Sequence, residues 1–140
     1  MDDSPAPVAE LERIYDLWEY NFMVEAYLAA GGEPEKAYAL AIVERVLAEK
    51  GDDAETCNAC AWALASHKAF PEKAVAIATR AYELSPDDPN IMDTLAEAYY
   101  AAGDFKNAAA WEKKALDREP KNGFFQEQLK KFKAACEGGK

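Results

Sequence analysis

The chain has 140 residues, half of them apolar, and a formal net charge of −10. This composition excludes a disordered tail. The acidic charge argues against nucleic acid or an anionic membrane as the ligand, since both attract basic patches. No apolar run approaches the roughly 20 residues of a membrane-spanning helix. Alanine is abundant while valine and isoleucine are sparse, which favours an all-helical protein whose helices approach closely.

The first seven residues are acidic and contain Pro5 and Pro7, unlike the basic start and apolar centre of a signal peptide. We expect residues 1–7 to form a disordered lead or a linker cut from a longer protein. A cytoplasmic setting is the expectation for a chain without such a signal. The alternative is that the chain is a fragment of a larger or exported protein.

Helical patterns fill the rest of the chain and are separated by residues that end helices. The predicted helices cover residues 8–30, 34–50, 54–68, 71–84, 88–102, 105–118 and 122–136. Gly31 and Gly51 supply helix ends, and Pro34 suits the first turn of the helix that follows. Pro86 and Pro120 close two later segments because proline cannot continue a helix interior. Nothing in the chain predicts a β-strand.

The pattern occurs three times along the chain. The motif EAYLAAG at residues 25–31 recurs as EAYYAAG at residues 97–103, and PEKA at residues 34–37 recurs at residues 71–74. Between the second and third copies the offset is 35 in the first helix and 34 in the second, so one residue is lost from the turn. A helical pair cannot bury its own apolar face, and we therefore expect the three copies to stack.

A period near 34, a proline after the second helix and small residues where helices cross resemble the tetratricopeptide repeat family. The third copy matches best, at Leu95, Ala96, Tyr99, Gly103, Ala108, Ala115 and Pro120. The second copy has Lys68 and Ala69 where the glycine would stand. The first copy has Glu44 where Ala81 and Ala115 stand later.

This resemblance covers roughly residues 17–122 and implies three antiparallel helical hairpins in a right-handed superhelical stack. The implied hairpins cover about residues 8–53, 54–88 and 89–122, with a C-terminal capping helix and tail at residues 123–140. The last helix has an approximate helical period of residues on one face, with Lys130, Lys131 and Lys133 around them, which predicts a lid on the third hairpin. The residues of this face are Phe124, Phe125, Gln128, Leu129 and Phe132. The competing interpretation is an amphipathic helix that binds a partner. Families of this kind serve mainly as protein-binding scaffolds.

In the resembling family, one face of the first helix of each hairpin lines a concave groove. The residues predicted to line it here are Asn21, Glu25, Asn58, Trp62, Asp93, Glu97 and Tyr100. Asparagine offers both a donor and an acceptor to an extended peptide backbone. An exposed tryptophan flanked by carboxylates suits a Lys or Arg side chain, through cation–π contact and ion pairing. The alternative is that Trp62 packs against a neighbouring helix and that the carboxylates are only solvated.

Cys57 and Cys60 have the C-x-x-C spacing of redox and zinc sites. The repeat places them at apolar core positions instead, and a zinc site would need His67 and Cys136 as its remaining ligands. We therefore expect both cysteines to pack in the core. His67, the only histidine, is expected near a helix end, where it would interact with the helix dipole.

Three hypotheses about function follow. The leading one is a non-enzymatic adaptor that binds an extended, neutral-to-basic segment of another protein, without cofactor or metal. The second is a structural oligomerisation or accessory module of a larger protein, which self-associates through Trp18, Trp62 or Tyr100. The third is a thiol redox or metal-binding role for Cys57 and Cys60.

Overall fold

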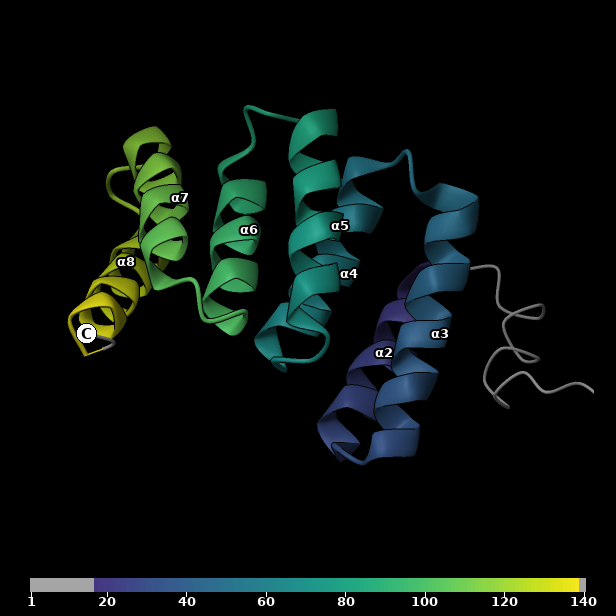
Figure 1. The fold of residues 1–140 in the computed structure, drawn as a ribbon. Helices are drawn as coiled ribbons and strands as arrows, with labels where there is room; N and C mark the ends of the chain where they lie inside the picture. Colours follow the sequence, from purple (N-terminus) through teal and green to yellow (C-terminus); the bar gives the residue numbers. More distant parts are fainter. Residues whose placement is uncertain (1–16, 139–140) are drawn as a thin grey trace, which may run out of the picture.

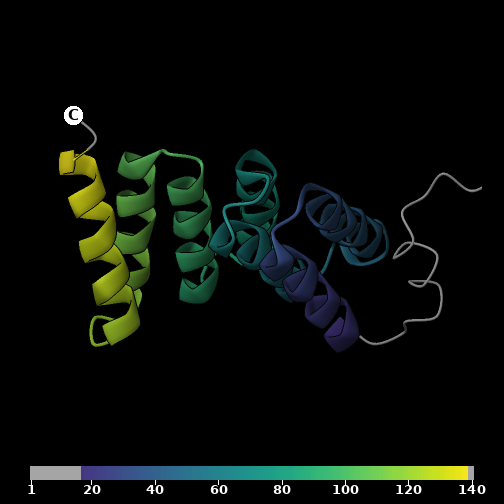
Figure 2. The same cartoon turned by 90° about the horizontal axis from the view of Figure 1, so that it is seen from below.

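The computed structural model describes residues 17–138, which form only helices and turns. The helices are α2 (Leu17–Ala30), α3 (Glu33–Lys50), α4 (Ala54–Ser66), α5 (Pro71–Leu84), α6 (Pro89–Ala101), α7 (Phe105–Arg118) and α8 (Gly123–Gly138). The prediction of an all-helical fold is confirmed for this part of the chain. The helices form one elongated row with α2 and α3 at one end and α8 at the other (Figure 1), and Figure 2 shows the same row from below. None of these helices is long and apolar enough to cross a bilayer.

The predicted helix ends agree with the structure to within two residues wherever they fall in the described chain. The predicted helical residues 8–16 and the predicted lead at residues 1–7 lie outside it. Local capping explains several starts. The Asp53 carboxylate accepts a hydrogen bond from the backbone N–H of Thr56 at 3.1 Å, and the Asn122 side chain accepts one from the N–H of Phe125 at 3.1 Å.

The turn between α4 and α5 differs from the expected continuation of α4 to residue 68. Lys68 adopts φ 53°, in the left-handed region that Gly31 (φ 76°) and Gly103 (φ 83°) occupy in the other two copies. The α4–α5 and α6–α7 turns also share a hydrogen-bond pattern, since the N–H groups of Lys68 and Gly103 each bond to the carbonyl three residues earlier. Phe70 takes a second left-handed conformation, φ 48°, which accommodates the one residue by which this turn is longer.

Alanine fills the places where helices cross. The completely buried alanines are Ala39, Ala61, Ala65, Ala74, Ala78, Ala81, Ala96, Ala98, Ala108 and Ala115. Methyl side chains let neighbouring helix axes approach closely, and larger side chains such as Leu28, Ile42 and Leu64 complete the core.

Helix α8 covers the end of the row. The face packed on the row buries Phe125, Gln128, Leu129 and Phe132, whereas Lys130 and Lys133 stay exposed. The prediction that Phe124 belongs to this face is wrong, because its side chain is 53% exposed at the first turn of α8. Phe125 packs beside Met92 and Ala115, so this face lies against both α6 and α7. The packing determines which groove residues remain open to solvent.

Candidate partner-binding surface

The residues predicted to line a groove come from three neighbouring helices. They are Asn21 and Glu25 on α2, Asn58 and Trp62 on α4, and Asp93, Glu97 and Tyr100 on α6. Helix α4 contacts both α2 and α6, so the structure places the three sets next to one another. Their surroundings differ along the row, because α8 covers the part on α6 and leaves the part on α2 and α4 open.

The prediction that Asp93 and Glu97 line an open groove is wrong, because both side chains are buried, with exposures of 6% and 8%. The Nε2 atom of Gln128 on α8 donates to Oε2 of Glu97 at 2.7 Å and to Oδ1 of Asp93 at 3.4 Å. The repeat register assigned both carboxylates to one face of α6, but that same face receives α8. Neither side chain therefore lines an open groove.

The cation expected from a partner is supplied by the chain itself. The Nζ atom of Lys131 on α8 lies 3.6 Å from Oε2 of Glu97 and 4.8 Å from the centroid of the Tyr100 ring. Ion pairing and cation–π contact are thus combined at this end of the row, in a partly exposed setting. Sequence reasoning missed this role. The signal was the spacing of Lys131 three residues after Gln128, which places both on one face of α8.

A third buried carboxyl group lies beside this pair. Glu112 on α7 has no exposed surface, and neither of its oxygens accepts a hydrogen bond from a donor in the described chain. Burial, and after it the neighbouring Asp93, raise the pKa of Glu112 to about 10. Burial also raises the pKa of Asp93. The signal for Glu112 in the sequence was its place between Ala108 and Ala115 on one helical stripe.

The part of the surface on α2 and α4 is open. Glu25 is exposed, and Asn21, Asn58 and Trp62 are half-buried. The Oδ1 atom of Asn58 is itself buried and receives no hydrogen bond from any residue of the described chain. Glu25 Oε2 lies 2.7 Å from Nε2 of His67, which joins α2 to the end of α4. Because the Oδ1 atom of Asn58 is buried while the residue as a whole is only half-buried, a partner's N–H group would reach it after rotation of the Asn58 side chain.

Two large aromatic side chains are exposed near this surface. Phe22 on α2 is 69% exposed and Phe124 at the start of α8 is 53% exposed. The ring of Phe124 lies with its centroid 6.3 Å from that of Trp62. Trp62 therefore does contact a neighbouring helix, as the alternative interpretation required, although it keeps part of its surface accessible. Exposed aromatic area of this kind is typical of interaction sites.

Cys57 and Cys60 occupy the core, as their repeat positions predicted, with exposures of 1% and 6%. Both thiols are free, and burial raises the pKa of each, to about 12 for Cys60. The thiol of Cys57 donates to the carbonyl oxygen of Gly51 at 3.4 Å. Throughout the described chain, no group of three or more His, Cys, Asp and Glu side chains is arranged to hold a metal ion.

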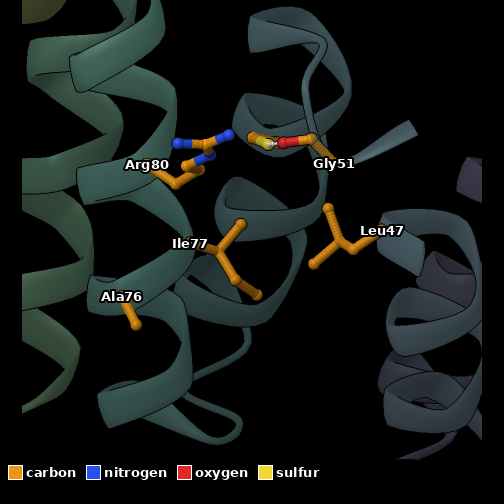
Figure 3. A pocket seen from close by; sticks show the side chains of 6 residues that line it. Leu47, Gly51, Ala76, Ile77 and Arg80 are labelled. Carbon is orange, nitrogen blue, oxygen red and sulfur yellow. Dashed lines mark hydrogen bonds between the residues drawn. The ribbon is translucent and has the colours of Figure 1, made fainter. Parts of the chain in front are cut away.

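An apolar trough runs between α3 and α5. Figure 3 shows Leu47 and Ile77 facing each other across it, with Arg80 at one end. This part has a volume of about 310 Å³, and an adjoining hollow of about 210 Å³ shares both apolar side chains. The trough lies where the first copy departs from the repeat, with Glu44 in the place of an alanine. Glu44 is exposed, and its Oε1 atom pairs with Nζ of Lys73 on α5 at 3.1 Å. The corresponding alanines of the other copies are fully buried, which lets those helices pack more closely.

The described residues form an all-helical structure that is consistent with a helical repeat fold, and comparison with known proteins agrees. The chain is 32% identical over 90 residues to TPR repeat-containing protein PA4667 of Pseudomonas aeruginosa. The aligned region covers 61% of this chain but only 15% of that relative's length. No family model matches the chain. The similarity and the all-helical fold fit a tetratricopeptide-like protein, and they suggest protein partners.

Proposed function

We propose that the chain is a protein-interaction module that holds an extended segment of a partner protein on the face formed by α2 and α4. The observation that carries this proposal is the Oδ1 atom of Asn58, buried in that face without a hydrogen-bond donor from the described residues. An unsatisfied buried acceptor costs free energy, and rotation of the half-buried Asn58 side chain toward a peptide N–H group of a partner would recover it. Asn21 occupies the same place in the preceding copy.

The proposed architecture is three tetratricopeptide-like hairpins followed by a capping helix, with a concave face formed by α2, α4 and α6. The hairpins would cover about residues 8–53, 54–88 and 89–122. The repeated sequence offsets support this arrangement, and so does the matching geometry at Gly31, Lys68 and Gly103. A stack of this kind acts as a scaffold because its elongated face is continuous from copy to copy.

The partner segment is neutral to basic. Glu25 is exposed on the open part of the face, and the net charge of −10 favours approach of a cation over that of an acidic segment. At the other end Lys131 already pairs with Glu97. Glu25 has the His67 imidazole at 2.7 Å but stays exposed, so a basic side chain of the partner belongs beside Glu25 and Trp62.

The test is a selection of peptides on the whole 140-residue chain. A displayed library of peptides about 16 residues long is panned against the protein, and enriched peptides are synthesised and titrated calorimetrically. We expect them to contain Lys or Arg and to bind at least about tenfold more weakly to Asn58→Ala, because the acceptor is gone.

The matched control is Asn107→Ala, which alters an exposed asparagine on α7. Enriched peptides should bind this variant and the wild type equally. Equal binding to Asn58→Ala and the wild type, or selection of acidic peptides, would contradict the proposed site.

Self-association is a second candidate function, favoured by the 69% exposure of Phe22. If this aromatic side chain forms a contact between copies, the sedimentation coefficient should rise with concentration for the wild type. The same dependence should be lost in Phe22→Ser. A monomer at all concentrations would exclude this role.

A further inference from the structure

Three carboxyl groups from two helices converge beneath α8. Asp93 and Glu97 come from α6, and Glu112 comes from α7. Their exposures are 6%, 8% and 0%, so none has enough contact with water to be stabilised as an isolated anion. Such a concentration of buried carboxyl groups requires compensation.

The compensation that the described chain provides is incomplete. The charged groups acting on Glu112 are Asp93 and Glu97 from α6 and Lys131 from α8. Lys131 is 43% exposed and lies 3.6 Å from Glu97. The amide of Gln128 donates to Glu97 and Asp93, whereas Glu112 receives no hydrogen bond. If all three groups were ionised, three anions would face one partly solvated cation.

A single proton bound by these carboxyl groups reduces the excess of negative charge. A neutral Glu112 is a hydrogen-bond donor, and the side chain of Asp93 is the acceptor within reach of it. The proton then joins Asp93 to Glu112 and removes one of the negative charges that Gln128 and Lys131 would otherwise have to offset. Two carboxyl groups that share one proton are a known arrangement where like charges cannot both ionise.

We propose that the junction of α6, α7 and α8 is a proton-binding site, in which Glu112 and Asp93 hold one proton that is required for α8 to dock. The ligand is the proton itself, and none of the three carboxyl groups belongs to the proposed partner site on α2 and α4. When α8 leaves, the carboxyl groups meet water and the proton is released to solvent. Docking of α8 is therefore coupled to proton uptake.

The direction of the pH effect follows from this linkage. Burial, together with the neighbouring Asp93 and Glu97, raises the pKa of Glu112 to about 10, above its ordinary value of 4.5. The stabilisation from the proton is complete below the unfolded pKa and is lost as pH rises toward the folded one. For one proton, the equilibrium constant for opening of α8 should grow by up to about tenfold per pH unit between about pH 5 and pH 9.

Hydrogen exchange of the α8 amides tests the coupling in the whole chain. Exchange is followed by mass spectrometry at about pH 5.5, 7.0 and 8.5, a range that spans the predicted transition, and is corrected for the pH dependence of intrinsic exchange. The wild type and the control Glu119→Gln, which alters an exposed glutamate, should show opening that increases with pH. Glu112→Gln should show opening independent of pH, because its amide donates as the neutral carboxyl group does.

Opening of α8 that is independent of pH in the wild type would overturn the proposal, and so would an unchanged slope in Glu112→Gln. A measurement on the wild type alone covers the case in which this variant does not fold. The side-chain carboxyl carbon resonance of Glu112 should report a neutral group at about pH 7 and titrate well above it. An ionised Glu112 at neutral pH would also overturn the proposal.

Discussion

The rings of Trp62 and Phe124 lie with their centroids 6.3 Å apart, although their helices, α4 and α8, stand on either side of α6 in the row (Figure 1). The contact joins the second copy directly to the C-terminal helix. It also explains why Trp62 is half-buried although its position in the repeat predicts a surface residue. The aromatic pair therefore connects the open part of the surface to the part that α8 covers.

Phe124→Ala should weaken this connection without unfolding the protein. Aromatic pairs contribute about 0.5–1.5 kcal/mol beyond area burial, so we expect a loss of about 1 kcal/mol in urea unfolding. Trp62 should become more accessible, and its fluorescence should shift to longer wavelength and quench more readily with acrylamide. The matched control is Lys130→Ala, an exposed change on the same helix that should leave both measurements unaltered.

Phe132→Ala should be much more damaging. Phe132 on α8 is fully buried against Ala96 of α6 and Ala108 of α7. The centroid of its ring lies 5.0 Å from that of Tyr100. Removing a buried phenylalanine side chain costs about 3–5 kcal/mol, because apolar contacts are lost and a cavity remains. The exposed neighbour is the control, since Lys133→Ala should stay within about 0.5 kcal/mol of the wild type. Similar values for both variants would show that α8 is not packed as described.

Lys68→Gly should be more stable than Lys68→Ala. A left-handed conformation costs an L-residue about 1–2 kcal/mol, and glycine regains this while it loses about 0.5–1 kcal/mol in chain entropy. The expected difference is about 0.5–1 kcal/mol by thermal or urea unfolding. The alanine variant is the proper reference because both changes remove the ammonium group that lies over the Tyr100 ring. Equal stability would mean that the turn relaxes to negative φ.

The thiols should react in a fixed order. Burial raises the pKa of Cys60 to about 12 and also raises that of Cys57, so little thiolate forms at neutral pH. Cys136 is partly exposed. With a thiol-specific chromogenic reagent at about pH 7.5, we expect Cys136 to react first and the other two only after denaturation. Rapid modification of Cys57 or Cys60 in the native protein would support the thiol-dependent function instead.

Much of the fold could be predicted from the sequence, because the residues that begin and end helices are recognisable locally. Glycine, proline and capping residues ended the predicted helices within two residues of the observed ends, and the repeat register assigned Cys57 and Cys60 to the core. The place of Lys68 at the position of a glycine indicated that its backbone could be left-handed. Its conformation itself follows from the geometry of the turn, which residue type does not reveal.

Which surface residues are exposed was harder to predict from the sequence, because exposure depends on contacts between helices far apart in the chain. The register assigned Glu25 and Glu97 to equivalent faces, but it does not reveal that α8 covers one and leaves the other exposed. Glu112 shows the same limit, since a glutamate on a helix is exposed far more often than it is buried. Only its alanine neighbours on the stripe gave an indication.

The short tether of Lys131 has a consequence for competition at Glu97. Residues 119–122 join α7 to α8, so the ammonium group of Lys131 is never far from its carboxylate. A group held by a short connection acts at an effective concentration of order millimolar or higher. A free basic peptide displaces Lys131 only when its concentration, weighted by its affinity for Glu97, exceeds this effective concentration. Glu25 contacts the His67 imidazole rather than a lysine ammonium group, and it stays exposed. We therefore expect dilute basic ligands to be bound first at the α2 end of the row.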